Sequence, residues 1–344
     1  MRTPLPGLEL AVPLIAAPMA GGASTTAMVT AAAHAGGVGF VPAGYRSTAD
    51  VAERIAAVRA AGVPFGVNLF APPPVPVDPD AFRRYADDLE SDAATFDLTL
   101  RDAALVEDDD QWQDKVDLLL ADPVPVVSFT FGIPDRRTVA ALRRAGTLTW
   151  QTVTGPVEAQ AAADAGVDAL IVQAAAAGGH SGTLSPHRPL PELRLGDLLA
   201  AVRARTGLPM VAAGGIGTAA DVAAAGRAGA AAVVVGTVLL RTRESGISAT
   251  YRAALAEGAR DTVVTRAFTG RPARGLRNDF IDRHTARAPL GYPAIHHLTA
   301  PMRRAAAAAG DPERLHLWAG TAYRHAREES LAETFGRLYQ GAGV

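Results

Sequence analysis

The sequence predicts an α/β barrel in which eight parallel strands alternate with helices. Short apolar or β-branched runs recur along the chain, and Ala-rich or amphipathic helical segments separate them. The predicted strands are residues 13–18, 38–42, 64–69, 124–130, 147–152, 167–173, 209–213 and 232–236. Closing eight such strands into a (β/α)8 barrel, the TIM barrel, removes the exposed edges that an open sheet would leave. An open, doubly wound sheet is the alternative that the same alternation allows.

Glycines mark the boundaries between the predicted helices and the strands that follow them. In chain order, a glycine follows a helical segment and lies within a few residues of the next strand at Gly36, Gly62, Gly146, Gly166, Gly207 and Gly229. Glycine adopts the left-handed conformation that ends many helices without the steric cost of a Cβ atom. These positions therefore support a regular succession of strand and helix.

Residues 71–121 interrupt this succession after the third strand. The segment opens with APPPVPVDPD and continues as acidic sequence with apolar residues at helical spacing, including Phe82, Tyr85 and Leu89. We therefore expect a helical insertion near the carboxyl-terminal rim of the barrel. The acidic run at 107–110 predicts a solvated loop or helix start and no metal site, because carboxylates adjacent in sequence cannot all face one ion.

Residues 259–344 follow the eighth strand and lack the strand pattern of the barrel. They contain several helical stretches, such as 301–309. We expect a helical extension that packs against a barrel formed by residues 1–258, rather than an independent domain.

The histidines and arginines of this extension are expected to have surface or packing roles. The adjacent pair His296 and His297 does not have the spacing of metal ligands on a helix, so no metal is expected there. The same expectation covers His284, His316 and His325, and surface charge is expected for Arg271, Arg274 and Arg277.

Composition limits the classes of function. The 344 residues are 49% hydrophobic and 20% charged with a formal net charge of −2, so the chain has no electrostatic case for nucleic acid or an anionic membrane. The chain has no cysteine, which excludes disulfides, thiolate metal sites and a cysteine nucleophile. Pro13 and Pro18 interrupt the apolar N-terminal stretch, and no other stretch predicts a spanning helix, so a cytoplasmic location is the default expectation. The oligomeric state stays unknown.

The segment QAAAAGGHSG, residues 173–182, places a histidine on a glycine-rich loop directly after an apolar strand. A side chain just beyond the carboxyl end of a parallel strand projects into the cleft where α/β folds bind their ligands. His180 is therefore the leading candidate for a catalytic residue. The alternative is a loop histidine that caps a backbone carbonyl.

Two later loops have the features of an anion site. The seventh strand leads into AAGGIG, where Gly214 and Gly215 precede a helix, and the eighth leads into VVVGT, where Gly236 and Thr237 follow the strand. Glycine lets phosphate oxygens approach the backbone N–H groups, and barrels commonly bind phosphate with this pair of loops. The alternative is that these glycines only form tight turns.

Two amide side chains end predicted strands at the same mouth of the barrel. Asn68 ends the third strand and Gln173 ends the sixth. A flavin ring presents carbonyl acceptors and an N–H donor along one edge, and carboxamides satisfy both kinds of group. Together with a phosphate site, the amides point to FMN, although each alone is also typical of a turn.

A series of motifs runs in order along the chain. They are APMAGG (17–22), FGVNLF (65–70), VSFTFG (127–132), QAAAAGGHSG (173–182), AAGGIG (212–217), VVVGT (233–237), GRPARGLRN (270–278), YPAIHHLTAPMRRAAA (292–307) and LWAG (317–320). Over nearly its full length the chain resembles the nitronate monooxygenases, a family of flavoproteins.

The resemblance implies a set of functional residues. His180 matches the catalytic base of that family. The positions expected at FMN are Met19, Asn68, Gln173, Gly178, Gly179, Gly214, Gly215, Gly236 and Thr237. The chain departs from the family pattern at Ala174 and Ala176, where the family usually has Gly and Glu, so any contact of that carboxylate is missing here.

The implied reaction is the oxidation of an alkyl nitronate by FMN and O2 to a carbonyl compound and nitrite. Where the neutral nitroalkane is also a substrate, a base removes the proton from its Cα, and a histidine with a pKa of about 6.5 suits this role. One alternative is a related FMN barrel that takes hydride from NAD(P)H, such as an enoyl or quinone reductase. A barrel that resembles IMP dehydrogenase would need a cysteine, and a non-catalytic FMN-binding protein is a further alternative.

Overall fold

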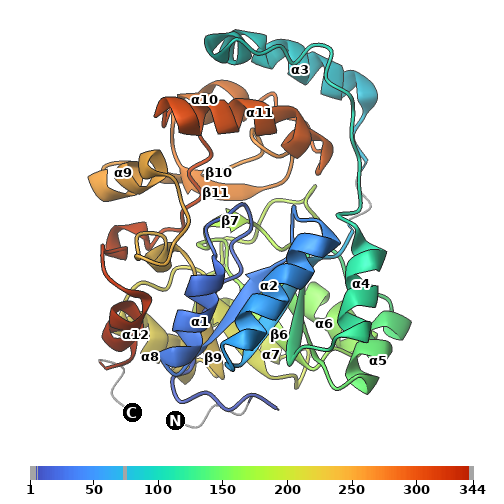
Figure 1. Cartoon of the computed structure of the whole chain (residues 1–344), viewed down its shortest axis with the longest axis vertical. Helices are drawn as coiled ribbons and strands as arrows, with labels where there is room; N and C mark the ends of the chain where they lie inside the picture. The colour runs from blue at the N-terminus through green and yellow to red at the C-terminus, as the bar shows by residue number, and fades with distance from the viewer. Residues whose placement is uncertain (1–4, 6, 73–75, 341–344) are drawn as a thin grey trace.

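The computed structural model describes residues 5, 7–72 and 76–340, and its core is a closed barrel of parallel strands (Figure 1). Its strands are β1 (Leu14–Ala16), β2 (Val38–Pro42), β3 (Phe65–Phe70), β4 (Val126–Thr130), β5 (Leu148–Val153), β6 (Ala169–Gln173), β8 (Met210–Ala213) and β9 (Ala232–Val235). β1 pairs with both β2 and β9, which closes the barrel, with Ile15 opposite Val234. The predicted strands and the TIM barrel are confirmed, and the alternative of an open sheet is wrong.

Alternation of side chains along the strands divides the core in two. Ile15, Phe40, Trp150 and Ile171 belong to one buried cluster with the apolar N-terminal residues, and the rings of Phe40 and Trp150 lie 5.6 Å apart. The intervening strand residues belong to separate clusters that include residues of the surrounding helices. Alternate strand residues thus fill the interior of the barrel, and the residues between them pack against the helices on its outer face.

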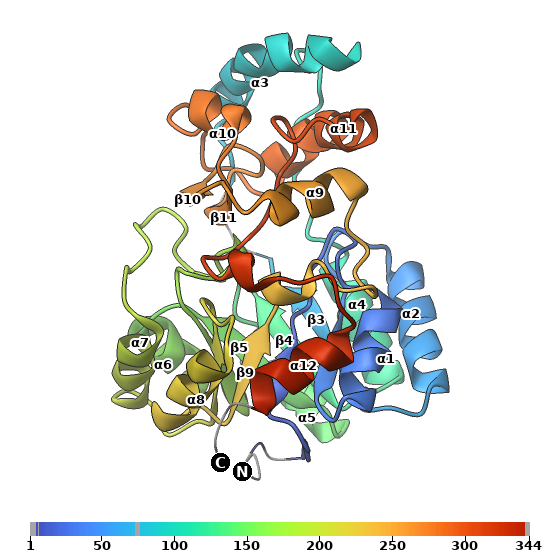
Figure 2. The same ribbon diagram turned by 90° about the vertical axis from the view of Figure 1, so that its left-hand side faces the viewer.

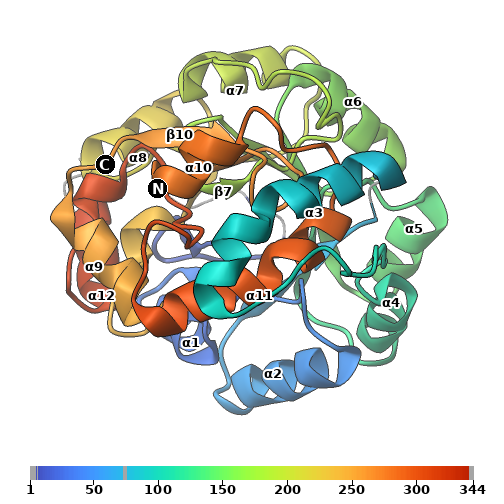
Figure 3. The same cartoon turned by 90° about the horizontal axis from the view of Figure 1, so that it is seen from above.

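Helices form a ring around the barrel (Figure 3). They are α1 (Thr26–His34), α2 (Thr48–Ala60), α4 (Trp112–Ala121), α5 (Arg136–Arg144), α6 (Pro156–Ala165), α7 (Leu195–Arg203), α8 (Ala219–Arg227) and α12 (Leu331–Tyr339). The last of these, α12, comes from the end of the chain. It packs against both α1 and α8 and thereby completes the ring (Figure 2). No helix in the described ranges is long and apolar enough to cross a membrane.

The part of the insertion that lies outside the ring of helices is shorter than the predicted segment 71–121. α4 contacts α2, α5 and β3, so it is a helix of the ring. Before it, α3 (Pro79–Ala93) and the 3-10 turn η1 (Ala94–Phe96) lie over the barrel mouth, where α3 packs against α11 (Ala294–Ala309). The predicted segment 71–121 also contains residues 73–75, which lie outside the described residues.

The buried carboxylate of Asp92 joins the insertion to the extension. Its oxygens lie 2.7 Å from His284 Nε2 and 2.8 Å from Arg314 Nε, and Arg283 also donates to it. Burial alone would raise the pKa of Asp92, but the hydrogen bonds from His284 and Arg283 outweigh burial and lower it to about 2. Through this cluster α3 is fastened to α10 (Asp279–His284).

The extension is not made of helices alone. Beside α10 and α11 it contains two antiparallel strands, β10 (Thr262–Thr265) and β11 (Ala273–Leu276), and α9 (Ala249–Glu257) directly precedes it. These strands form a small sheet with β7 (Gly179–His180), a short strand of the barrel's own loop. The expected helical extension is present, and it also contains two strands that are too short for their periodicity to be recognised in the sequence.

The position of α12 leads to a test of barrel stability. Phe335 is 1% exposed and belongs to the same cluster as Leu14 and Met28 of the first barrel unit. We expect Phe335→Ala to lower the free energy of unfolding by about 3–5 kcal/mol, because it leaves a cavity between α12 and the barrel. Urea unfolding followed by circular dichroism measures this, with the exposed Ala332→Gln as control. A loss below about 1 kcal/mol would mean that α12 contributes little to the barrel.

Candidate active site

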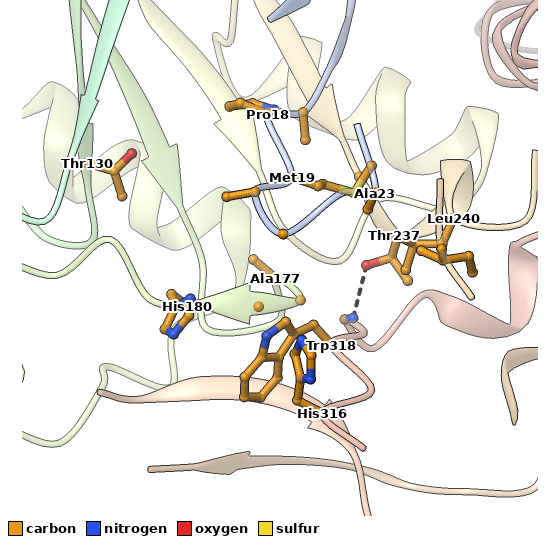
Figure 4. Close-up of a pocket in the computed structure, with 18 of the residues that line it drawn as sticks. Pro18, Met19, Ala23, Thr130, Ala177, His180, Thr237, Leu240, His316 and Trp318 are labelled. Atoms are coloured by element: carbon orange, nitrogen blue, oxygen red, sulfur yellow. Dashed lines mark hydrogen bonds between the residues drawn. The ribbon is translucent and has the colours of Figure 1, made fainter. Parts of the chain in front are cut away.

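A cavity of about 590 Å³ lies at the carboxyl ends of the barrel strands, beneath the extension. All of the residues that the sequence and the family resemblance single out line it. They are Met19, Asn68, Gln173, Gly178, Gly179, His180, Gly214, Gly215, Gly236 and Thr237. In Figure 4, His180 lies toward one end of the drawn site and Thr237 toward the other. The cavity has a size typical of small-molecule sites.

The extension fixes the position of His180. In the small sheet His180 pairs with Ala273 of β11, and the N–H of Ser181 donates to the carbonyl of Pro272 at 2.8 Å. The ring nitrogen Nε2 of His180 lies 2.9 Å from Thr269 Oγ1, at hydrogen-bond distance. Aromatic rings surround the imidazole, with centroids 5.5 Å away at Trp318, 5.7 Å at Phe131 and 5.8 Å at Tyr292.

The environment of His180 keeps its imidazole neutral. Burial, with the positive charges of Arg271 and Arg303, lowers its pKa from 6.5 to about 3. The expectation of a pKa near the working pH is therefore wrong for this structure. A neutral imidazole has a free lone pair at physiological pH, and the lowered pKa makes it a weaker base than a free histidine.

Arg271 holds the loop that carries His180, the histidine loop, through hydrogen bonds to its backbone carbonyls. It is 1% exposed, its Nε donates to the carbonyl of Ser181 at 3.3 Å, and its Nη2 donates to the carbonyl of Thr183. Its guanidinium lies 4.1 Å from the centre of the Phe131 ring. The expectation of surface charge is wrong for Arg271 and for the half-buried Arg274, whose Nε donates to a carbonyl of the same loop at 2.7 Å.

The two strand-end amides have different surroundings. Both amide atoms of Gln173 hold the histidine loop, since its Nε2 donates to His180 O at 3.2 Å and its Oε1 accepts from Gly182 N at 2.7 Å. The Nδ2 of Asn68 donates to Ser128 Oγ at 2.9 Å and to Thr130 Oγ1 at 3.1 Å. This leaves the Oδ1 of Asn68 as an acceptor in the cavity wall.

The two glycine loops offer unpaired N–H groups. Gly214 and Gly215 have φ values of +101° and +76°, which a residue with a side chain rarely adopts. Within the described chain, the N–H groups of these two glycines, and those of Gly236 and Thr237, donate to no backbone carbonyl. Such a group of free donors at the end of a barrel is suited to an anion.

The extension closes the glycine loops on their outer side. The N–H of Gly320 donates to Thr237 Oγ1 at 3.0 Å (Figure 4), and the N–H of Thr321 donates to the carbonyl of Ala176 at 3.0 Å. A Cβ atom at Gly178 would lie 2.5 Å from the nitrogen of Gly320, so only glycine fits there. Because Thr237 Oγ1 accepts from Gly320, its own proton is free to donate into the cavity.

Several residues of the cavity were not expected from the sequence. Tyr45, His296, Arg303 and His316 all line it. The rings of Tyr45 and His296 are stacked, with centroids 4.0 Å apart and planes at 4°. The stacking of His296 on Tyr45 agrees with the expected packing role, and both His296 and His316 also line the cavity. The spacing of seven residues between His296 and Arg303, which puts both on one face of a helix, was the available signal.

The acidic run of the insertion holds Tyr45 at the cavity. Asp110 accepts from the N–H of Tyr45 at 2.9 Å and pairs with the buried Nζ of Lys115 at 2.8 Å. Tyr45 has a φ of 64°, which is uncommon for a large side chain, so these contacts stabilise an unfavourable backbone conformation. Asp108 also lies 2.8 Å from His297 on α11. The run forms a loop with Glu107, Asp108 and Asp109 exposed, as expected, and its contacts at Asp108 and Asp110 also fasten it to its neighbours.

The fold and the site define a TIM-barrel protein with a cavity at the end of the barrel where enzymes of this fold have their active sites. No group of three or more histidine, aspartate or glutamate side chains in the described part of the chain is arranged to hold a metal ion.

Comparison with known proteins identifies the family. The family model described as nitronate monooxygenase matches residues 2–341. Probable nitronate monooxygenases of Staphylococcus aureus and Staphylococcus saprophyticus are 33% and 34% identical to this chain, and each alignment covers 92% of this chain and 90% of the relative. The chain belongs to the nitronate monooxygenase family and is an oxidoreductase.

Solved structures agree with this assignment. A nitroalkane oxidase from Streptomyces ansochromogenes is 44% identical, with a TM-score of 0.90 over 97% of this chain and 96% of that one. FabK from Thermotoga maritima is 26% identical, with a TM-score of 0.74 over 97% of this chain and 93% of that one.

The buried, neutral His180 predicts a pH dependence of stability. Below pH 6.5 the unfolded chain binds a proton at this position that the folded chain does not bind until about pH 3. The free energy of unfolding should therefore fall as the pH drops from 6.5 toward 3, by up to about 1.4 kcal/mol per pH unit from this residue. His180→Asn should have a shallower dependence in urea unfolding at pH 4 to 7. The exposed His187→Asn is the control and should keep the original slope; equal slopes in all three proteins would contradict the prediction.

Proposed function

We propose that this protein uses FMN and O2 to oxidise alkyl nitronates, and nitroalkanes after deprotonation, to carbonyl compounds and nitrite. The observation that carries the proposal is the neutral imidazole of His180 in a cavity whose other end has free N–H donors at Gly214, Gly215 and Gly236. Membership of the nitronate monooxygenase family supports it. A cytoplasmic location belongs to the same proposal, as does a small-molecule partner rather than a membrane or nucleic acid.

The cavity fits FMN in its donor chemistry. Free N–H groups of two glycine loops and the hydroxyl of Thr237 would hold the phosphate. Asn68 Oδ1 would accept from the flavin N–H, and Met19 would lie against the ring. When bound there, FMN supplies the electron transfer between substrate and O2.

The protein's own contribution is to orient the substrate, hold its proton and exclude water. Thr269 Oγ1 donates to the carbonyl of Arg271 at 3.3 Å and so accepts from Nε2–H of His180, which leaves Nδ1 to accept a proton from the Cα of a nitroalkane. The aromatic rings of Phe131, Tyr292 and Trp318 surround this position and keep it apolar. A preformed nitronate has already lost the proton and needs only to be bound and oriented.

One experiment tests cofactor and reductant together. The purified protein should have the visible spectrum of a flavin, and anaerobic ethyl nitronate should bleach it rapidly whereas NADH should not. Bleaching by NADH would favour the alternative of an FMN barrel that takes hydride from NAD(P)H. A flavin that responds to neither compound, nor to quinones or enoyl thioesters, would favour a non-catalytic FMN-binding protein.

The role of His180 is tested by replacing it with a residue that cannot accept the proton. His180→Asn should slow flavin reduction by nitroethane by about 10²–10⁴-fold, the usual contribution of a general base, while reduction by ethyl nitronate stays within a few fold. Stopped-flow absorbance measures both rates, and the exposed His187→Asn is the control. Equal losses on the two substrates would rule out the base role.

The role of Thr237 is tested by comparing two forms of the cofactor. Thr237→Val removes the hydroxyl that faces the expected phosphate, so it should weaken FMN binding by about tenfold, the value of one hydrogen bond to a charged group. Riboflavin lacks the phosphate, so its affinity should change by less than about twofold. Fluorescence titration of the flavin-free protein measures both constants. A parallel loss for both flavins would place the defect in the cavity as a whole.

A further inference from the structure

A buried arginine on α11 faces the end of the cavity that holds His180. Arg303 is 6% exposed, yet it lines the cavity together with His296 and His316. Its Nε donates to Thr299 Oγ1 at 3.0 Å, and its Nη2 donates to the carbonyl of His296 at 2.8 Å. Within the described chain, its Nη1 has no hydrogen-bond partner. The guanidinium is therefore held in a fixed position, and its Nη1 group is available to donate a hydrogen bond to a ligand.

No carboxylate balances the charge of this guanidinium. None of the ion pairs in the described part of the chain includes Arg303, although other buried charges are paired, such as Lys115 with Asp110. Burial lowers the pKa of Arg303 to about 10, so it stays charged at neutral pH. Its charge also contributes to the lowered pKa values of His180 and His316, which therefore stay neutral. This end of the cavity carries a net positive charge.

We propose that Arg303 binds the negatively charged nitro group of the nitronate and thereby favours the anionic substrate over the neutral nitroalkane. The inference rests on the proposed function and names the residue that recognises the substrate's charge. A nitronate spreads its charge over two oxygens in one plane, and a guanidinium presents its N–H groups in a plane. In a cavity with little water, this attraction is stronger than at the surface.

The second buried arginine of the site does not serve this purpose. Arg271 donates to the carbonyls of Ser181 and Thr183 and lies against Phe131, and it does not line the cavity. Thr237, one of the residues with a free N–H group where the phosphate of FMN is expected, lies toward the other end of the site from His180 in Figure 4. Arg303 is thus the buried cation available to the substrate.

The two substrates should report the loss of Arg303 in different kinetic constants. A nitronate is already charged when it binds, so the lost attraction should appear in KM. A nitroalkane is neutral when it binds and becomes charged only as His180 takes its proton, so the loss should appear in kcat. A general defect of folding or cofactor binding would not separate the substrates in this way.

The test uses the FMN-loaded variants Arg303→Met and Arg303→Lys. The control is Arg137→Met, which removes an exposed arginine of α5 that does not line the cavity. Arg303→Met should raise KM for ethyl nitronate by about 10–100-fold, which is the range for loss of a hydrogen bond to a charged group. The kcat for ethyl nitronate should stay within about threefold. For nitroethane it should leave KM within about twofold and lower kcat. Arg303→Lys should be intermediate, because it keeps the charge without the planar donors. An unchanged KM for ethyl nitronate, or an equal rise of KM for both substrates, would overturn the proposal.

A second measurement is independent of turnover. Nitrate is a planar, unreactive anion, and isothermal titration calorimetry measures its binding to the FMN-loaded proteins. We expect binding to wild type and Arg137→Met, and at least about tenfold weaker binding to Arg303→Met. If Arg303 controls nitrate affinity but no nitronate is oxidised, the anion site stands and the proposed reaction fails. If nitronate is oxidised and nitrate affinity is the same in all variants, the reaction stands and the anion site is overturned. Should Arg303→Met fail to fold, Arg303→Lys decides the same comparison.

Discussion

The pairing of β7 with β11 is the constraint on which the site depends. A barrel loop rich in glycine has no means of its own to fix a histidine, since glycine leaves the backbone many conformations. Here the loop becomes the edge strand of the extension's sheet, with His180 opposite Ala273 and Gly179 opposite Arg274. Thr269 at Nε2 of His180 and Arg271 at the following carbonyls come from the same part of the extension. Barrel and extension therefore share the site, and neither forms it alone.

The site also depends on an unusual distribution of charge. Two guanidiniums are buried near His180, and burial without a carboxylate partner is costly unless polar groups satisfy the N–H donors. Arg271 and Arg303 each donate from Nε and Nη2 to neighbouring oxygens, but only Arg303 lines the cavity. At the insertion the opposite arrangement holds, since Asp92 is surrounded by basic groups that stabilise its charge. The positive charge of Arg303 therefore remains unbalanced until an anion binds, whereas the negative charge of Asp92 is already balanced by its basic neighbours.

Local sequence signals explain why part of this structure could be predicted. Strands in a barrel are buried on both faces, so the eight apolar runs could be recognised singly; Gly214 and Gly236 directly follow such runs, and His180 lies on the loop after another. The small sheet, the return of α12 to the ring and the burial of Arg271 depend on contacts between residues far apart in the chain. Ser181 and Arg271, for instance, are separated by 90 positions. Neither periodicity nor spacing contains that information, and an isolated arginine looks like surface charge until its partners are known.

The alanine at position 176 fits the same electrostatic argument. The family resemblance implies a glutamate there, and in this structure Ala176 lines the cavity that Arg303 and His180 also line. A carboxylate at this position would offset part of the positive charge, and it would raise the pKa of the histidine. With alanine, none of the described residues that line the cavity is a carboxylate that would offset the charge of Arg303. The loss of the glutamate therefore does not remove a base that the mechanism needs; it leaves His180 neutral and strengthens the preference of the site for an anion.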